Sequence, residues 1–134
     1  MGEALGMEAK IDGEAVRLRI FIGETAHYHG KPLYHAIVMK ARELGLAGAT
    51  VMRAFEGYGA SSRIHTSNLL TLSADLPVVV EIVDSREFID KILPELDHMV
   101  TSGLVTMDPV NVLKYIHKHS SPNMHQGESK PPQS

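Results

Sequence analysis

The chain has 134 residues, no cysteine and no tryptophan, and its 16 acidic and 13 basic side chains give a net charge of -3. This length favours one domain with one hydrophobic core, and a hydrophobic share of 43% is ordinary for a globular protein. The mild negative charge argues against general binding to nucleic acids or membrane surfaces, which attract basic proteins. Without cysteine, disulfides and thiolate metal sites are excluded, and a reducing compartment such as the cytoplasm is expected.

Three regions follow from the distribution of hydrophobic residues along the chain. Residues 1–13 carry acids and no sustained apolar period, so we expect a loose N-terminal extension that is neither a secretory signal nor a membrane anchor. A single folded domain is expected from residue 14 to residue 117. Residues 118–134 contain three of the seven prolines and few residues to bury, which predicts a disordered C-terminal tail.

The first half of the domain predicts a strand, a helix and a second strand. Residues 15–22 alternate between aliphatic side chains and the pair Arg17 and Arg19, which is the period of a strand buried on one face. Apolar residues then recur every three or four positions over residues 33–44, which predicts a helix that ends before Gly45. Residues 49–56 favour a second strand.

The next part predicts a buried strand and a second helix. The run at residues 78–83 is too apolar for an edge and is expected in the middle of the sheet. Asp84 and Glu87 have the spacing of a capping box, and Ser85 is a competing cap for the helix that follows. Pro94 removes one backbone hydrogen bond inside this helix and is expected to bend it.

The last part of the domain completes the predicted fold. Residues 104–116 are extended, with an interruption expected at residues 108–109 and the fourth strand at residues 110–116. The order strand, helix, strand, strand, helix, strand is that of the ferredoxin-like α+β fold, in which two helices cover one face of a four-stranded antiparallel sheet. The other face would carry Arg17 and Arg19, and further copies of the chain would cover it, so self-association is expected.

Residues 57–68, which are rich in glycine and serine, are the leading candidate for a binding loop. Gly57, Tyr58 and Gly59 let the backbone expose several N–H groups, and Arg63 adds a positive charge, so this loop is suited to hold an anion. The alternative is a plain hairpin connection, for which glycine and serine are equally suitable.

Metal-binding and catalytic patterns are weaker. The eight histidines include the pairs His27 with His29 and His117 with His119, but a zinc site needs three or four converging ligands, so no metal site is expected. Glu81 lies in an apolar strand and needs a partner. Both an ion pair with an arginine or lysine across a subunit contact and a ligand contact stay open. No nucleophile with a base and an orienting group is recognisable, so no enzymatic activity is expected.

Several motifs, taken in their order and spacing, resemble the PII signalling superfamily. They are residues 44–51 (LGLAGATV), the turn Gly57-Tyr58-Gly59, residues 76–84 (LPVVVEIVD) and residues 101–103 (TSG). The similarity extends over roughly residues 15–116 and is greatest to a PII-like branch known only as a domain of unknown function. In that branch residues 30–34 (GKPLY) and 62–66 (SRIHT) also have counterparts.

The resemblance implies a homotrimer of ferredoxin-like subunits, with a cleft between neighbours and a loop beside each cleft. Relatives of this architecture sense adenine nucleotides or other small effectors in the cleft, and the loop then engages a target protein such as a transporter or an enzyme. Carried onto this chain, Gly57, Tyr58 and Gly59 match the base of the loop, and Glu81 and Val83 match strand positions beside the nucleotide.

One segment departs from the PII pattern. Where PII proteins have a glycine-rich segment that ends in lysine, residues 104–109 read LVTMDP, and Asp108 would repel a triphosphate. A ligand with less negative charge, such as a nucleoside monophosphate, is therefore favoured over ATP.

These observations predict a cytoplasmic PII-like regulatory protein without a required cofactor, which binds an effector such as AMP between subunits and signals through residues 57–68. The predicted ligand contacts are Gly57, Tyr58, Gly59 and Arg63 for an anion, Val83 for an apolar part and Glu81 for a polar edge, with His29, Lys31, Tyr34 and His65 as second choices. The alternatives are an oligomeric scaffold without a small ligand and a metal-handling trimer of the cation-tolerance type.

Overall fold

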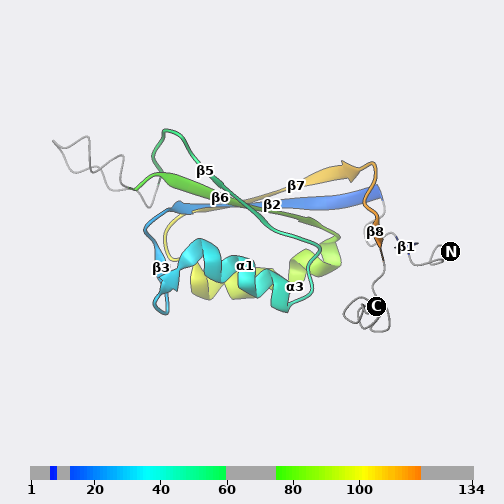
Figure 1. Ribbon diagram of the computed structural model, residues 1–134, viewed down its shortest axis with the longest axis horizontal. Helices are drawn as coiled ribbons and strands as arrows, with labels where there is room; N and C mark the ends of the chain where they lie inside the picture. The colour runs from blue at the N-terminus through cyan, green and yellow to red at the C-terminus, as the bar shows by residue number, and fades with distance from the viewer. Residues whose placement is uncertain (1–6, 9–12, 60–74, 119–134) are drawn as a thin grey trace, which may run out of the picture.

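The computed structural model describes residues 7–8, 13–59 and 75–118 of the chain. Its centre is an antiparallel sheet in the order β5-β6-β2-β7, built from β5 (Thr50–Arg53), β6 (Pro77–Asp84), β2 (Gly13–Gly23) and β7 (Leu104–Val112). The helices α1 (Leu33–Glu43) and α3 (Arg86–Met99) pack against one face of this sheet (Figure 1). This is the ferredoxin-like α+β layout predicted from the order of the elements.

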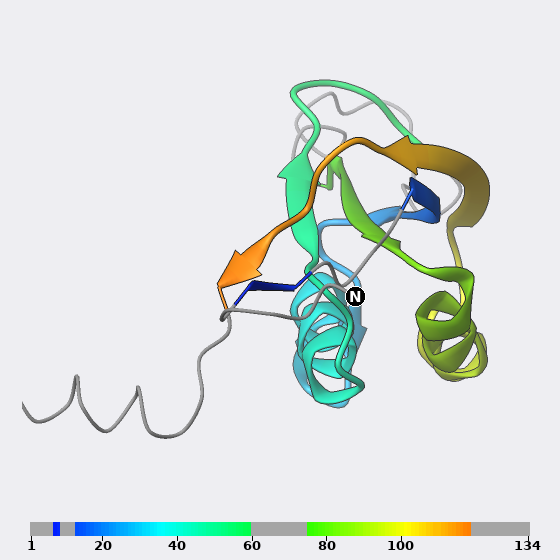
Figure 2. The same cartoon turned by 90° about the vertical axis from the view of Figure 1, so that its right-hand side faces the viewer.

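Alternation along the two central strands explains why the helices cover one face only. Leu18, Ile20 and Ile22 of β2 are buried, as are Val80 and Ile82 of β6, whereas the residues between them point to the opposite face. Figure 2 shows both helices on the same side of the sheet. The helix residues in this core are Leu33, Ile37 and Ala41 of α1, and Ile89, Ile92, Leu96 and Met99 of α3.

Two short strand pairs flank the main sheet. β3 (His27–Tyr28) and β4 (Lys31–Pro32) form a hairpin between β2 and α1. β1 (Met7–Glu8) pairs antiparallel with β8 (His117–Lys118), which brings the two ends of the described chain together (Figure 2). The N-terminal extension predicted to be loose therefore contributes one short strand, and the predicted C-terminal tail lies outside the described residues from residue 119 onward.

The edge strand β5 is shorter than the predicted strand at residues 49–56. Its four residues pair with β6 alone among the described strands, and pairing ends with a bond of 2.9 Å from the Ala54 N–H to the Pro77 carbonyl. The chain then leaves the sheet toward Gly57. Residues 54–56 are of types that favour a strand, but among the described strands none pairs with them beyond this bond.

The other edge strand, β7, is continuous where an interruption was predicted. It runs through Asp108 and Pro109 to Val112, and Pro109 lies opposite Val16 of β2. A proline is tolerated on an edge strand because its missing N–H need not face a neighbour. The predicted bounds of the fourth strand, residues 110–116, were wrong, since the strand is Leu104–Val112 and residues 113–116 follow it.

The start of α3 distinguishes between the two candidate capping residues. Ser85 is the N-cap, and its hydroxyl accepts a hydrogen bond of 3.3 Å from the Phe88 N–H. Asp84 is fully buried, and its carboxylate accepts bonds of 2.7 Å from the N–H groups of both Ala47 and Ser85. The capping box predicted from Asp84 and Glu87 is therefore wrong. Asp84 instead ties the end of β6 to the connection between α1 and β5.

The proline in the second helix does not end it, because α3 continues through Pro94 to Met99. Within the described residues, no helix combines the length and the apolar surface needed to cross a lipid bilayer.

Candidate functional site

The face of the sheet opposite the helices, called the open face below, is organised in rows that run across the strands. The first row is apolar and consists of Met52, Val79, Phe21 and Leu104, each paired with its neighbour on the next strand. The second row consists of Thr50, Glu81, Arg19 and Thr106, and the third of Val83, Arg17 and Asp108. Along the strands, an apolar row is therefore followed by two rows that carry charges.

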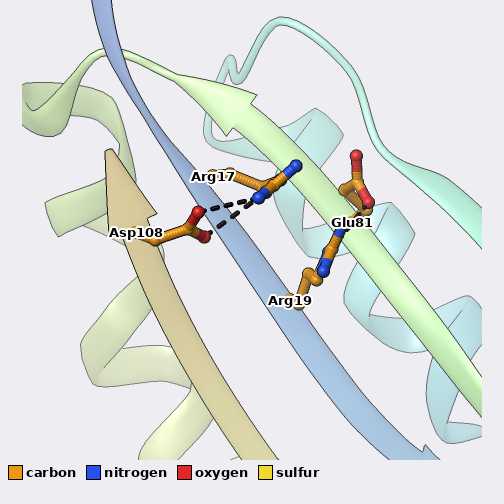
Figure 3. Close-up of polar contacts among 4 residues, drawn as sticks. All are labelled: Arg17, Arg19, Glu81 and Asp108. Atoms are coloured by element: carbon orange, nitrogen blue, oxygen red, sulfur yellow. Dashed lines mark hydrogen bonds and ion pairs between the residues drawn. The ribbon is translucent and has the colours of Figure 1, made fainter. Parts of the chain in front are cut away.

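Each charged row contains one ion pair between neighbouring strands (Figure 3). Arg17 donates from Nη2 and Nε to the two carboxylate oxygens of Asp108, at 2.7 and 3.3 Å. Arg19 donates from Nε to Glu81 Oε1 at 3.2 Å. The ion pair of Glu81 was expected across a subunit contact, but it forms within one subunit. It leaves the second carboxylate oxygen of Glu81 able to accept a further bond.

The hydrogen bond from Arg17 lowers the pKa of Asp108 below its ordinary value, and the same bond raises the pKa of Arg17. Asp108 is therefore ionised at neutral pH, with a cation beside it that compensates its charge. The predicted repulsion of a triphosphate by Asp108 is weakened accordingly. Residues 104–109 lie in β7, so this segment forms an edge strand where PII proteins are expected to have a phosphate loop.

A hollow of about 360 Å³ lies at the end of the open face where β5 begins and β6 ends. Its lining consists of residues 47–50, Glu81, Val83, Val112, Lys114 and Tyr115, and it is called the Glu81 pocket below. Pockets that bind small molecules have volumes of about 300–1,000 Å³. The hollow is therefore large enough for a small ligand or for part of a larger one.

The connection between α1 and β5 forms one wall of the Glu81 pocket, and the local backbone explains its shape. Gly45 ends the helix with a φ of 84°, a left-handed conformation that is favourable for glycine. Leu46 is buried in the core, and the N–H of Ala47 is held by the buried carboxylate of Asp84 at 2.7 Å. Asp84 therefore holds this wall on the side of the core. On its other side the wall is open, because a Cβ at Gly48 would contact nothing within 4 Å.

The Glu81 pocket offers apolar contacts together with polar groups of both charges. Val83 and Val112 give it an apolar part, Glu81 supplies an acceptor, and Lys114 supplies a cation. This combination suits a small molecule that has a ring or other apolar portion, a hydrogen-bond donor and an anionic group. Within the described residues, no group of three His, Asp or Glu side chains is arranged to hold a metal ion.

The structure divides the predicted ligand contacts between the two ends of the sheet. Glu81 and Val83 both line the Glu81 pocket. Gly57, Tyr58 and Gly59 follow β5 at the other end, where the Cβ position of Gly57 is 3.7 Å from the ring of Pro77, the first residue of β6. One subunit therefore does not bring these two groups together.

The second-choice contacts lie at the same end as the glycine turn. His29 and Lys31 belong to the β3–β4 hairpin, which follows the end of β2, and Tyr34 is in the first turn of α1. The ring of His29 stacks on the ring of Tyr28 with centroids 4.0 Å apart, and Tyr34 packs partly against the core. Arg63 and His65 lie outside the described residues.

Sequence reasoning missed most of the pocket lining. Residues 47–50 were recognised only as part of a motif, although Gly45 signalled the end of the helix just before them. Lys114 and Tyr115 were assigned to the fourth strand, because nothing in the apolar pattern of residues 110–116 shows that the chain leaves the sheet after Val112.

Two larger hollows lie along β7, with volumes of about 700 and 760 Å³. The first is next to the second half of α3, and the second is next to Arg86, whose Nε already donates to Asp90 at 2.8 Å. Neither hollow contains a predicted ligand contact. The Glu81 pocket is the better candidate because a hollow and two independently predicted contacts coincide there.

Comparisons with known proteins identify relatives of the whole domain. The family model described as "DUF190: Uncharacterized ACR, COG1993" matches residues 15–112. A UPF0166 protein of Aquifex aeolicus (strain VF5) is 44% identical over 96 residues, which are 72% of this chain and 90% of that protein. The UPF0166 protein MJ1524 of Methanocaldococcus jannaschii is 32% identical over 98 residues, with the same two shares.

One solved structure is also similar. It is a candidate PII-like signaling protein from Thermus thermophilus, with a TM-score of 0.49 and 20% identity over 76% of this chain and 93% of that one. The family assignment rests on the sequence matches, which cover most of the folded domain. The chain belongs to this family of uncharacterised proteins.

Proposed function

We propose that this chain is a PII-like regulatory protein that assembles as a homotrimer, binds a small effector such as AMP and reports the occupied state to a target protein. The observation that carries the proposal is the Glu81 pocket. It contains Glu81 and Val83, the two strand positions that the family resemblance assigns to the side of the nucleotide. The resemblance of the sequence to the PII-like branch supports the same interpretation.

The lining of the Glu81 pocket suits the parts of AMP. Val83 and Val112 offer apolar side chains to the faces of an adenine ring. Arg19 holds Glu81 at 3.2 Å and keeps one carboxylate oxygen occupied, so the other oxygen is able to accept a bond from the amino group of the ring. A single phosphate carries less negative charge than a triphosphate, so the nearby acidic groups repel it less.

The composition of the open face supports assembly of several copies. Met52 and Leu104, at the two ends of the apolar row, are 42% and 54% exposed in one subunit. The charges beside them are paired within the subunit, so burying this face leaves no unpaired arginine or carboxylate among the four residues of the two ion pairs. In a trimer formed through the open face, the Glu81 pocket at its margin would border a neighbouring subunit.

Two exposed aromatic residues support binding of a target protein. Phe55 is 96% exposed and Tyr58 is 71% exposed, and both lie in the chain that leaves β5. Aromatic residues are enriched at the centres of protein interfaces, where they contribute much of the binding energy. We propose that the segment beginning at these residues contacts the target, in accordance with the role that the resemblance gives to residues 57–68.

The test is calorimetric titration of AMP, ADP, ATP and cyclic AMP into the purified protein. We expect AMP to bind with one molecule per subunit and ATP to bind more weakly. Glu81→Gln should weaken AMP binding because its amide is a poorer acceptor. Glu95→Gln should not, because Glu95 lies on α3 and its carboxylate is 3.9 Å from the ammonium group of Lys40 on α1. Absence of binding by all four nucleotides between micromolar and low millimolar concentration would rule out the nucleotide effector.

A further inference from the structure

The chain that follows β7 forms a wall of the Glu81 pocket without belonging to the sheet. Residues 113–116 cross the end of the sheet, from the β7 edge toward the edge at which β5 begins (Figure 2). Lys114 and Tyr115 from this stretch line the pocket together with Glu81. The pairing of β8 with β1 fixes the stretch at its far end.

The charges around the pocket are unevenly compensated. Arg17 is paired with Asp108, and Arg19 is paired with Glu81. Lys114, by contrast, makes no ion pair or hydrogen bond to any other part of the described chain. Because Glu81 is already neutralised by Arg19, Lys114 gives the pocket a net positive charge at neutral pH.

This wall is also separate from the part of the chain that defines the family. The family match ends at residue 112, which is the last residue of β7, whereas Glu81 and Val83 lie well inside the matched region. The pocket therefore combines a floor that lies within the family match with a wall that lies beyond it. A residue in that wall is well situated to set which ligand this chain accepts.

From these observations we propose that Lys114 makes the Glu81 pocket selective for a phosphate monoester attached to a ring or another apolar group. The ammonium group donates hydrogen bonds to the phosphate oxygens, while Val83 and Val112 contact the apolar part. This inference rests on the proposed effector site and adds to it the residue that recognises the anion.

The experiment compares AMP with adenosine, which differ by the phosphate alone. Both are titrated by calorimetry into the wild-type protein and into Lys114→Gln, Lys114→Arg and Lys91→Gln. Lys91→Gln is the matched control, because it also removes one positive charge. Lys91 lies on α3 and does not line the pocket, and its ammonium group is 4.1 Å from the centre of the Phe88 ring. All titrations are performed at the same low salt concentration, since exposed charges are screened.

We expect Lys114→Gln to weaken AMP binding about fivefold and to change adenosine binding by less than about twofold, as for loss of one exposed charge-assisted contact. Lys114→Arg should keep most of the affinity, and Lys91→Gln should behave as the wild type does. Unchanged AMP binding in Lys114→Gln would overturn the role of Lys114 and leave the proposed function intact. An equal loss for AMP and adenosine would also overturn it, because it would indicate a structural role.

If the wild-type protein binds neither compound, the nucleotide function fails and the anion site is judged separately. Methyl phosphate is then added to isotopically labelled protein, and the backbone amide signals of residues 47–50 are followed by NMR. Shifts that saturate in the wild type and disappear in Lys114→Gln would support the anion site. Absence of shifts in the wild type would overturn it.

Discussion

Replacement of Asp84 by asparagine tests whether one buried carboxylate holds the wall of the Glu81 pocket. Asp84 has no exposed surface, and its two oxygens accept bonds of 2.7 Å from the N–H groups of Ala47 and Ser85. Asparagine has nearly the same size but keeps a single acceptor oxygen. One of the two N–H groups must then face an NH₂ group, and it is left buried without a partner.

The magnitude follows from this loss. A hydrogen bond to a charged group contributes about 1.5–3 kcal/mol, and a buried donor without a partner costs about 1–3 kcal/mol. These two estimates describe largely the same loss, and the neutral amide is easier to bury than a carboxylate. We therefore expect Asp84→Asn to lower the free energy of unfolding by about 2–3 kcal/mol.

The assay is urea denaturation at one fixed protein concentration, because the proposed self-association would make the midpoint depend on concentration. Asp90→Asn is the control. Asp90 is half exposed, and its carboxylate is 2.8 Å from Nε of Arg86, which lies one turn earlier on α3. Such an exposed pair contributes about 0.3–0.5 kcal/mol. Equal midpoints for Asp84→Asn and Asp90→Asn would refute the assignment of Asp84 as the anchor of the pocket wall.

Three further predictions address the backbone, the charged rows and the open face. Gly103→Ala should lower the free energy of unfolding by about 3 kcal/mol, because φ is 155° and the new Cβ would lie 2.5 Å from a carbonyl oxygen of β2. Gly59→Ala is the control, because a Cβ there has no neighbour within 4 Å, and equal stability of the two variants would contradict the prediction. NMR titration should give Asp108 a pKa below its ordinary value, returning toward it in Arg17→Gln. Because that folded pKa is depressed, the contact stabilises the protein above the pKa of an unfolded aspartate and loses its effect as pH falls through the folded pKa; a carboxyl that titrates normally in the wild type would disprove it. Val79→Lys should convert the proposed trimer to smaller species in light scattering, and an unchanged mass would argue against assembly through the open face.

The central part of the fold was predictable because a buried strand is visible in the sequence, either as alternation of apolar and polar residues or as a continuous apolar run. The alternation of Leu18, Ile20 and Ile22 with two arginines marks β2, and the apolar run of β6 marks its central position. Edges are harder to predict. Strand propensity alone does not show that β5 ends at Arg53 or that Pro109 lies within β7, since both depend on whether a partner strand is present.

The candidate site was predictable only in part, and the reason is topological. Glu81 and Val83 were identified because they match strand positions of the family that the sequence resembles, and both line the pocket. Lys114 and Tyr115 reach the same pocket from a distant part of the chain, after a turn away from the sheet that has no sequence signature. The role of Asp84 was also missed, because its spacing to Glu87 imitates a helix cap.

The most direct test of the regulatory account is native mass spectrometry of protein taken from cells without a purification tag, followed by addition of AMP. The account predicts a trimer as the dominant species and binding of up to one AMP for each subunit. A monomer that acquires no nucleotide at any concentration of AMP tested would contradict it.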